Sequence, residues 1–248
     1  MTNRKGVAEL AGSAALGAWA GFAVLALVVT GGHGAPLHLD RSLLSWSVGH
    51  RPATAVAVAR GLTATGTGVL PYALVALAGL LVGGSRRQRP VTALLGVACL
   101  ASGQAVRYGV MELTGRARPP YRYWQTHASG LSFPSGHTTT SALTAGLLLL
   151  ALCLRARHGR LRMCLAVACW AAGVGLTRVY LGVHWATDVL GGWLFAVGWL
   201  GAWLCAAAWW LPDRLIPAAA SGSGALAGGD AAGAPPEGHA PRDTGRRD

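Results

Sequence analysis

Acidic residues are scarce in this chain of 248 residues, where nine Asp and Glu stand against 21 Lys and Arg. The only acids before residue 212 are Glu9, Asp40, Glu112 and Asp188. A divalent cation needs several ligands close together, and carboxylates this far apart in the sequence do not supply them. We therefore expect no bound metal and no other cofactor.

Cysteines are also few, and their spacing matches neither of the patterns that cysteines usually form. They are Cys99, Cys153, Cys164, Cys169 and Cys205. Their number is odd, no two are separated by two residues, and all lie in apolar runs, which argues against a disulfide framework and against a zinc site. We interpret them as small apolar side chains in helix packing.

Charged residues make up only 12% of the chain, whereas apolar residues make up 52%. These proportions are typical of integral membrane proteins. A membrane-spanning helix needs about 20 mainly apolar residues. The runs that meet this requirement lie at about 7–30, 66–84, 91–110, 137–155, 163–180 and 185–211. The sequence thus predicts an all-α polytopic membrane protein, a bundle of six transmembrane helices in which the first run is too long to be a signal-peptide core.

The segments outside these runs are more polar. We predict that residues 31–52 form an external loop and that residues 52–64 form a helix lying at the membrane interface. Residues 212–248 are rich in Ala, Gly, Pro and Ser with scattered charge, a composition that cannot bury a core. The expected organisation is one domain over residues 1–211 and a disordered cytoplasmic tail over residues 212–248.

The formal net charge of +12 does not indicate nucleic-acid binding, because the basic residues form short clusters between apolar runs. These clusters lie at residues 4–5, 86–89 and 155–162. Cytoplasmic loops of membrane proteins carry an excess of Lys and Arg, so we expect all three clusters on the cytoplasmic side. Membrane lipids are then the expected surroundings of the chain, and the ends of the helices opposite the clusters face outward.

Three short motifs beside the apolar runs carry polar side chains whose transfer into a bilayer costs free energy. They are Arg116-Ala117-Arg118-Pro119, Pro134-Ser135-Gly136-His137, and Thr177-Arg178 followed by His184 and Asp188. Polar groups at such positions are usually functional. Arginine binds phosphate bidentately, a carboxylate four residues after a histidine can orient its imidazole, and a helix start offers free N–H groups to an anion. Together these groups are suited to hold a phosphate, attack its phosphorus and protonate the leaving group.

These motifs resemble those of the type 2 phosphatidic acid phosphatase (PAP2) superfamily, membrane lipid phosphatases that share a site with vanadium haloperoxidases. The family motifs read roughly Lys-x6-Arg-Pro, Pro-Ser-Gly-His and Ser-Arg-x5-His-x3-Asp. The second is complete here, and the third has Thr177 where Ser is usual. The first is matched only at Arg118-Pro119, because Met111 occupies the lysine position. All three would lie at the external membrane face.

The resemblance implies a role for each matched residue. His184 becomes phosphorylated, Asp188 orients it, and His137 is the general acid. The implied phosphate ligands are Arg118, Arg178, the Ser135 hydroxyl and the Gly136 N–H.

Two arginines outside the matched positions are open to more than one interpretation. Arg107 lies one helical turn before Met111 and is a candidate phosphate ligand in place of the missing lysine. A weaker site or a different substrate is the alternative. Arg116 is equally well interpreted as another phosphate ligand or as an interfacial cation that extends to the membrane surface.

The function that these features predict is a multi-pass phosphatase of the cytoplasmic membrane. It would remove phosphate from a lipid phosphate or prenyl diphosphate through a phosphohistidine, without a metal. Undecaprenyl-diphosphate-like and phosphatidate- or phosphatidylglycerophosphate-like substrates both remain open. A vanadium haloperoxidase shares the residues of the site but is usually soluble, and the six predicted spans argue against that class. A catalytically weakened family member acting in lipid binding or transport is the other alternative, favoured by Met111.

Overall fold

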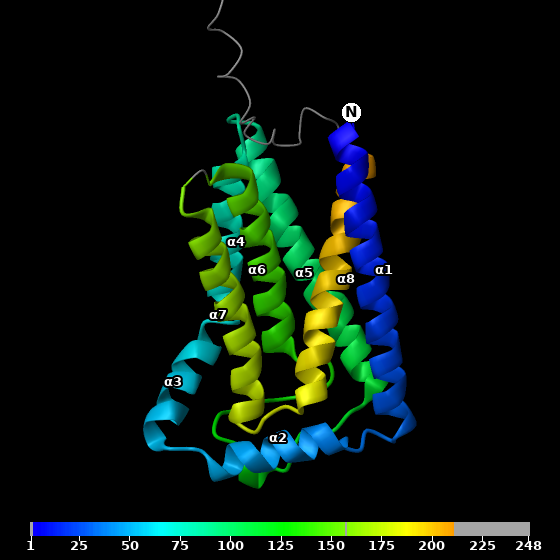
Figure 1. Ribbon diagram of the computed structural model, residues 1–248, viewed down its shortest axis with the longest axis vertical. Helices are drawn as coiled ribbons and strands as arrows, with labels where there is room; N and C mark the ends of the chain where they lie inside the picture. Colours follow the sequence, from blue (N-terminus) through cyan, green and yellow to red (C-terminus); the bar gives the residue numbers. More distant parts are fainter. Residues whose placement is uncertain (1, 157, 211–248) are drawn as a thin grey trace, which may run out of the picture.

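The computed structural model describes residues 2–156 and 158–210, which fold into a bundle of helices (Figure 1). The helices are α1 (Thr2–Gly31), α2 (His38–Gly49), α3 (Ala53–Ala64), α4 (Val69–Val82), α5 (Gln88–Thr114), α6 (Gly136–Arg155), α7 (Arg160–Tyr180) and α8 (Ala186–Trp210), with a 3-10 turn at Tyr121–Tyr123. No strand occurs in this described part of the chain, as the all-α prediction requires. The expected tail, residues 212–248, lies outside the described residues.

Five of these helices are long and apolar enough to cross a membrane: α1, α5, α6, α7 and α8. Helices α3 and α4 form a pair bent by 50°, which makes a sixth span if the pair is taken as one. Alone, the 14 residues of α4 reach about 21 Å at about 1.5 Å per residue, less than the roughly 30 Å of the hydrocarbon core. The span predicted at 66–84 thus contains a helix shorter than expected, and the bent pair with α3 supplies the missing length. The chain between α3 and α4 contains Gly68, whose φ of 74° is unsuited to a helix.

Helices α1 and α8 pack closely along their length because α8 presents glycine to α1. A Cβ built on Gly201 would lie only 2.6 Å from the Cβ of Ala15, and one on Gly198 would lie 2.9 Å from the Trp19 ring. Small residues of this kind let helix backbones approach in membrane bundles. The close pair holds the start of α8, which carries Asp188, against the rest of the bundle.

An aromatic cluster joins the chain between α5 and α6 to these two helices. Phe133, which is fully buried, stacks on Phe22 of α1 with 5.5 Å between ring centroids, and Phe195 of α8 meets Phe22 edge-on. Such contacts contribute beyond the apolar area that they bury. The cluster fixes the end of residues 115–135 directly before the second motif.

Helix α2 lies across the end of the bundle where α6 begins and α7 ends (Figure 1). Residues 31–52 were expected to form a loop, but His38–Gly49 are helical, and the Asp40 carboxylate accepts a hydrogen bond from the Leu37 N–H at 3.0 Å at the helix start. The outer face of α2 exposes Leu39, Leu43 and Trp46. An apolar face of this kind suits a helix lying flat in a membrane interface.

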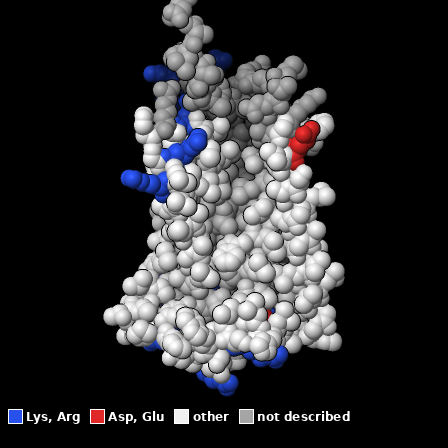
Figure 2. Space-filling model, in the orientation of Figure 1, with Lys and Arg blue, Asp and Glu red and all other residues white. Residues whose placement is uncertain are grey.

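Charged side chains on the face drawn in Figure 2 gather toward the two ends of the molecule and leave an uncharged band between them. This distribution is expected of a membrane protein, because isolated charges are costly in the hydrocarbon core. The prediction of a multi-pass membrane protein is confirmed by the helices and by this surface.

Candidate active site

The three motifs meet at one end of the bundle. The second motif opens α6, the third joins the end of α7 to the start of α8, and the first lies in residues 115–135. Backbone hydrogen bonds tie these segments together: the Ser135 N–H donates to the Asp188 carbonyl at 3.0 Å, and the Ser132 N–H donates to the Arg116 carbonyl at 2.8 Å. The site is thus built from segments that are far apart in sequence.

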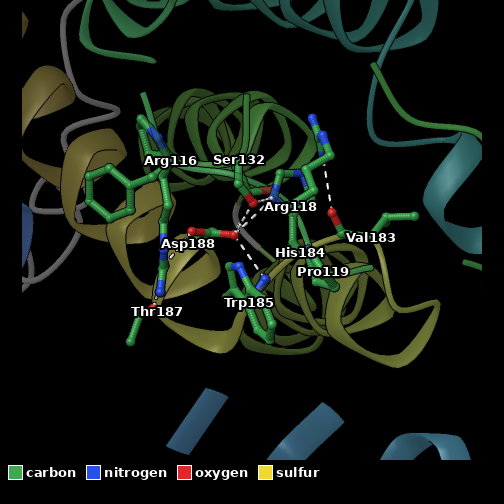
Figure 3. A network of polar contacts seen from close by, with 12 residues as sticks. Arg116, Arg118, Pro119, Ser132, Val183, His184, Trp185, Thr187 and Asp188 are labelled. Carbon is green, nitrogen blue, oxygen red and sulfur yellow. Dashed lines mark hydrogen bonds and ion pairs between the residues drawn. The ribbon is translucent and has the colours of Figure 1, made fainter. Parts of the chain in front are cut away.

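His184 and Asp188 form a buried pair at the centre of this site (Figure 3). The His184 Nδ1 lies 3.3 Å from the Asp188 Oδ2, which also accepts the Trp185 N–H at 2.8 Å and the Ser132 hydroxyl. The His184 Nε2 faces Arg118, whose Nη1 donates to it at 2.8 Å. These partners assign the proton to Nδ1 and leave a lone pair on Nε2.

Electrostatics favour the neutral imidazole. Burial lowers the pKa of His184 to about 4, and the positive charge of Arg118 acts in the same direction, whereas the hydrogen bond that His184 donates to Asp188 opposes both. At neutral pH the His184 imidazole is therefore unprotonated on Nε2. A nitrogen nucleophile must be in this form to attack phosphorus.

Arg118 is held by carbonyl oxygens as well as by His184. Its Nη1 donates to the Val183 carbonyl at 2.9 Å, its Nε to Gly130 at 3.0 Å and its Nη2 to Ser129 at 2.8 Å. Burial lowers the pKa of this guanidinium, and the nearby Asp188 carboxylate partly offsets the effect. The structure therefore aims the Arg118 guanidinium at the nucleophilic face of His184.

Arg178 comes from α7 and is almost fully buried. Its Nη1 donates to the Thr63 hydroxyl at 3.0 Å, whereas its Nε has no hydrogen-bond partner among the described residues. A buried donor without an acceptor is costly. An anion that enters the site would supply the missing acceptor.

Arg107 lies against the second motif from α5. A Cβ built on Gly136 would be 3.3 Å from the guanidinium carbon of Arg107. The Arg107 Nη1 lies 3.5 Å from both the Met111 Sδ and the Pro134 carbonyl oxygen. Its Nε donates to Gln104 at 2.8 Å. The guanidinium thus occupies the region beside the position where the family motif has lysine.

The turn that opens α6 contributes the remaining predicted residues. Ser135 is fully buried at the N-cap and accepts the Thr138 hydroxyl at 3.0 Å, and Gly136 is the first helical residue. His137 follows in the first turn, partly exposed, within the electrostatic reach of Arg178, His184, Arg118 and Arg107. All eight residues predicted for the site therefore lie at this end of the bundle; their roles stay predictions.

Sequence reasoning missed a second layer of charged residues behind His184. Arg116 is fully buried and donates to the Asp188 Oδ1 at 2.6 Å and to the Asp40 Oδ2 at 2.7 Å. It does not extend to the membrane surface, which was one of the two interpretations of this residue. Asp40 had no predicted role because its segment was expected to be a loop. The only signal for it was the rarity of acids.

Across the described ranges 2–156 and 158–210, no three His, Cys, Asp or Glu side chains come together in a group that could hold a metal ion. Three arginines, Arg107, Arg118 and Arg178, instead lie near the two histidines and the Asp188 carboxylate. This arrangement can bind a compact anion and present a nitrogen lone pair to it.

The fold and site define a class: a multi-pass helical membrane protein with a buried, arginine-rich site around a His–Asp pair. The family model of the PAP2 superfamily matches residues 74–213, more than half of the chain. The chain belongs to the PAP2 superfamily, and the resemblance drawn from the three motifs is confirmed.

Two relatives give this assignment more detail. The chain is 40% identical over 87 residues to phosphatidylglycerophosphatase B of Bacillus subtilis (strain 168), a stretch that covers 34% of this chain and 41% of that relative. The structure of the present chain is similar to the crystal structure of a transmembrane PAP2 type phosphatidylglycerolphosphate phosphatase from Bacillus subtilis, with a TM-score of 0.62 and 25% sequence identity. That match covers 78% of this chain and 93% of the other. The sequence match therefore spans less than half of the curated relative, whereas the structural match spans nearly the whole solved chain.

Proposed function

We propose that this protein is a membrane phosphatase that hydrolyses the phosphomonoester of a lipid such as phosphatidylglycerophosphate, through a phosphohistidine on His184. The observation that carries the proposal is the excess of buried positive charge around His184, including the unpaired Nε of Arg178. Arg107, Arg118 and Arg178 face this region, and the one nearby carboxylate, Asp188, is already bound by Arg116. A phosphate dianion would balance these charges and accept the free donors.

The relatives support the lipid class. Both are named for the dephosphorylation of phosphatidylglycerophosphate, and the structural similarity extends over most of each chain. A prenyl diphosphate presents the same terminal phosphate and is the alternative substrate. In either case the lipid tail would remain in the bilayer while the head group enters the end of the bundle.

The first chemical step would use the lone pair on the His184 Nε2. An incoming phosphate takes over the Arg118 donor that now points at this nitrogen. Nε2 then bonds to phosphorus as the bond from phosphorus to the leaving oxygen breaks, and His137 gives that oxygen a proton. The arginines stabilise the charge on the equatorial oxygens, and Asp188 keeps its hydrogen bond to Nδ1.

The second step would release the phosphate. Water attacks the phosphorus of the phosphohistidine, His137 now takes the proton of the water, and the bond between phosphorus and Nε2 breaks. Inorganic phosphate leaves, and His184 returns to its neutral form. No residue changes its net protonation over the cycle.

The test is phosphate release from purified protein in detergent with a panel of lipid phosphates and diphosphates. We expect turnover with phosphatidylglycerophosphate, no turnover or phosphoenzyme with His184→Ala, and slow residual turnover with Asp188→Asn. His158→Ala, a change at an exposed histidine of the α6–α7 turn, is the matched control and should behave as wild type. A folded wild-type protein that releases phosphate from none of the lipids would support the lipid-binding alternative instead, and a phosphohistidine trapped at another residue would contradict the assigned roles.

A further inference from the structure

Asp40, Arg116 and Asp188 form a continuous buried chain of charges behind the candidate nucleophile. All three side chains have no solvent exposure. The Arg116 Nη2 lies 2.7 Å from the Asp40 Oδ2, and the Nη1 lies 2.6 Å from the Asp188 Oδ1. Each carboxylate therefore holds one of the two terminal nitrogens of the same guanidinium.

Further hydrogen bonds fix this arrangement. The backbone N–H of Thr187, directly before Asp188, donates to the Asp40 Oδ1 at 2.9 Å. The Thr187 hydroxyl oxygen accepts a hydrogen bond from the Arg116 Nη1 at 2.7 Å. The Asp40 Oδ2 also accepts the Leu37 N–H at 3.0 Å. The Thr187 hydroxyl also donates to the Asp40 carboxylate at 2.9 Å, so Asp40 is bound by four donors from three segments.

The net charge of the three groups depends on Asp40. Arg116 alone would neutralise Asp188, the one carboxylate that supports His184. Because Asp40 shares the guanidinium, the three groups carry one net negative charge in a buried setting where charges interact strongly. The other charged groups that face His184, Arg118 from residues 115–135 and Arg178 from α7, are positive.

We propose that Asp40 is a positioning residue, which acts through Arg116 to keep Asp188 oriented and negatively charged toward His184. The proposal rests on the phosphatase activity proposed above. It makes α2 a part of the active site, although α2 lies outside residues 74–213 that the family model matches.

The expected effect is on chemistry rather than on substrate binding. Positive charge develops on the His184 ring as Nε2 bonds to phosphorus, and the negative chain behind Nδ1 stabilises it. None of the three groups faces the side of His184 that the substrate would approach. Loss of Asp40 should therefore lower kcat and leave KM nearly unchanged.

Asp40→Asn is the first variant, and we expect kcat to fall about tenfold, as when a residue that orients a ligand from behind is replaced. The double variant Asp40→Asn, Arg116→Gln removes one charge of each sign, so Asp188 again carries the net negative charge. It should turn over faster than Asp40→Asn. A simple anchoring role predicts the reverse, because the double variant loses more hydrogen bonds. Ser47→Ala, which removes another buried polar group of α2 with no link to Asp188, should retain the wild-type kcat.

The second measurement needs no turnover and decides the proposal even if the substrate or the activity is wrong. The proton between the His184 Nδ1 and Asp188 can be followed by ¹H NMR of protein with ¹⁵N-labelled histidines, with His184→Ala to assign the signal. We expect it to move upfield in Asp40→Asn and to return toward the wild-type position in the double variant. A signal at the wild-type position in Asp40→Asn would overturn the proposal, and so would a wild-type kcat in an otherwise active enzyme. If Asp40→Asn does not fold, a displaced signal in the double variant would overturn it.

Discussion

Arg107 and Met111 lie one helical turn apart on α5, and the Arg107 guanidinium faces the turn that opens α6. Arginine is longer than lysine, so a side chain one turn earlier, about 5–6 Å away along the helix, can bring a positive charge to the same anion. Burial of this guanidinium among Gln104, Met111 and the Pro134 carbonyl leaves it poised beside the second motif. We infer that it replaces the lysine of the family motif.

This inference predicts the effect of Arg107→Ala. The loss of one charge-assisted hydrogen bond to the phosphate should lower kcat/KM by the equivalent of about 1.5–3 kcal/mol. Met111→Lys in the Arg107→Ala background should restore part of the loss, because it returns the lysine of the motif. Steady-state kinetics of folded, detergent-purified variants measures both effects. Arg89→Ala, an exposed arginine of the same helix, is the control. Wild-type kcat/KM in folded Arg107→Ala would show that Arg107 has no part in binding.

The buried neutral His184 also makes stability depend on pH. Its pKa falls from 6.5 to about 4 on folding, so between these values the unfolded chain binds a proton that the folded protein does not. Stability is then fully present above about pH 6.5 and is lost as the pH falls toward 4, by up to about 3 kcal/mol.

Thermal unfolding in detergent from pH 7 to pH 4 tests this expectation. The wild type should lose stability as the pH falls, whereas His184→Gln should lose less because it lacks the titrating group. If the curves of wild type and His184→Gln run parallel over this range, burial of His184 does not carry the effect.

At the scale of elements, the break between α3 and α4 serves the site. Thr63, in the last turn of α3, accepts the hydrogen bond of Arg178, and Thr65, just beyond the helix, accepts the indole N–H of Trp170 at 2.8 Å. Both contacts join the bent pair to α7. The bend therefore places a hydroxyl partner beside Arg178.

Helix α2 shows why one element escaped prediction. Its twelve residues are too few for a span, and its apolar residues face the membrane interface as well as the bundle. Only the tertiary structure brings Asp40 to Arg116, 76 residues later in the chain. The long apolar helices were easier to recognise because their length alone requires a bilayer. Their ends differ from the predicted ones by a few residues, as in α5, expected at 91–110 and observed at Gln88–Thr114.

At the scale of the whole molecule, the site and the basic clusters lie at opposite ends. Arg155, Arg160 and Arg162 are exposed at the α6–α7 turn, whereas α2 and the three motifs lie at the other end (Figure 1). Because cytoplasmic loops are enriched in Lys and Arg, we propose that the site faces the outside of the cytoplasmic membrane. A lipid in the outer leaflet would then be the substrate.

Cysteine labelling tests this orientation. In a background without the five native cysteines, His127→Cys in residues 115–135 should react with an impermeant maleimide in intact, wall-stripped cells. His158→Cys, in the α6–α7 turn, should react only after the cells are opened. Both positions are exposed, so a difference between them reports the side of the membrane. Labelling of position 158 but not of 127 in intact cells would invert the proposed topology.

The sequence by itself determined the membrane class, most of the helices and the residues at the centre of the site. Long apolar runs have one stable solution in a bilayer, and the spacing of His184 and Asp188 is local to a single turn, so neither depends on distant parts of the chain. Only the tertiary structure decided that Arg116 is buried, that Asp40 belongs behind Asp188, and that Thr63 meets Arg178. These contacts join residues 71 to 115 positions apart, and such pairings arise from helix packing, which no local pattern in the chain records.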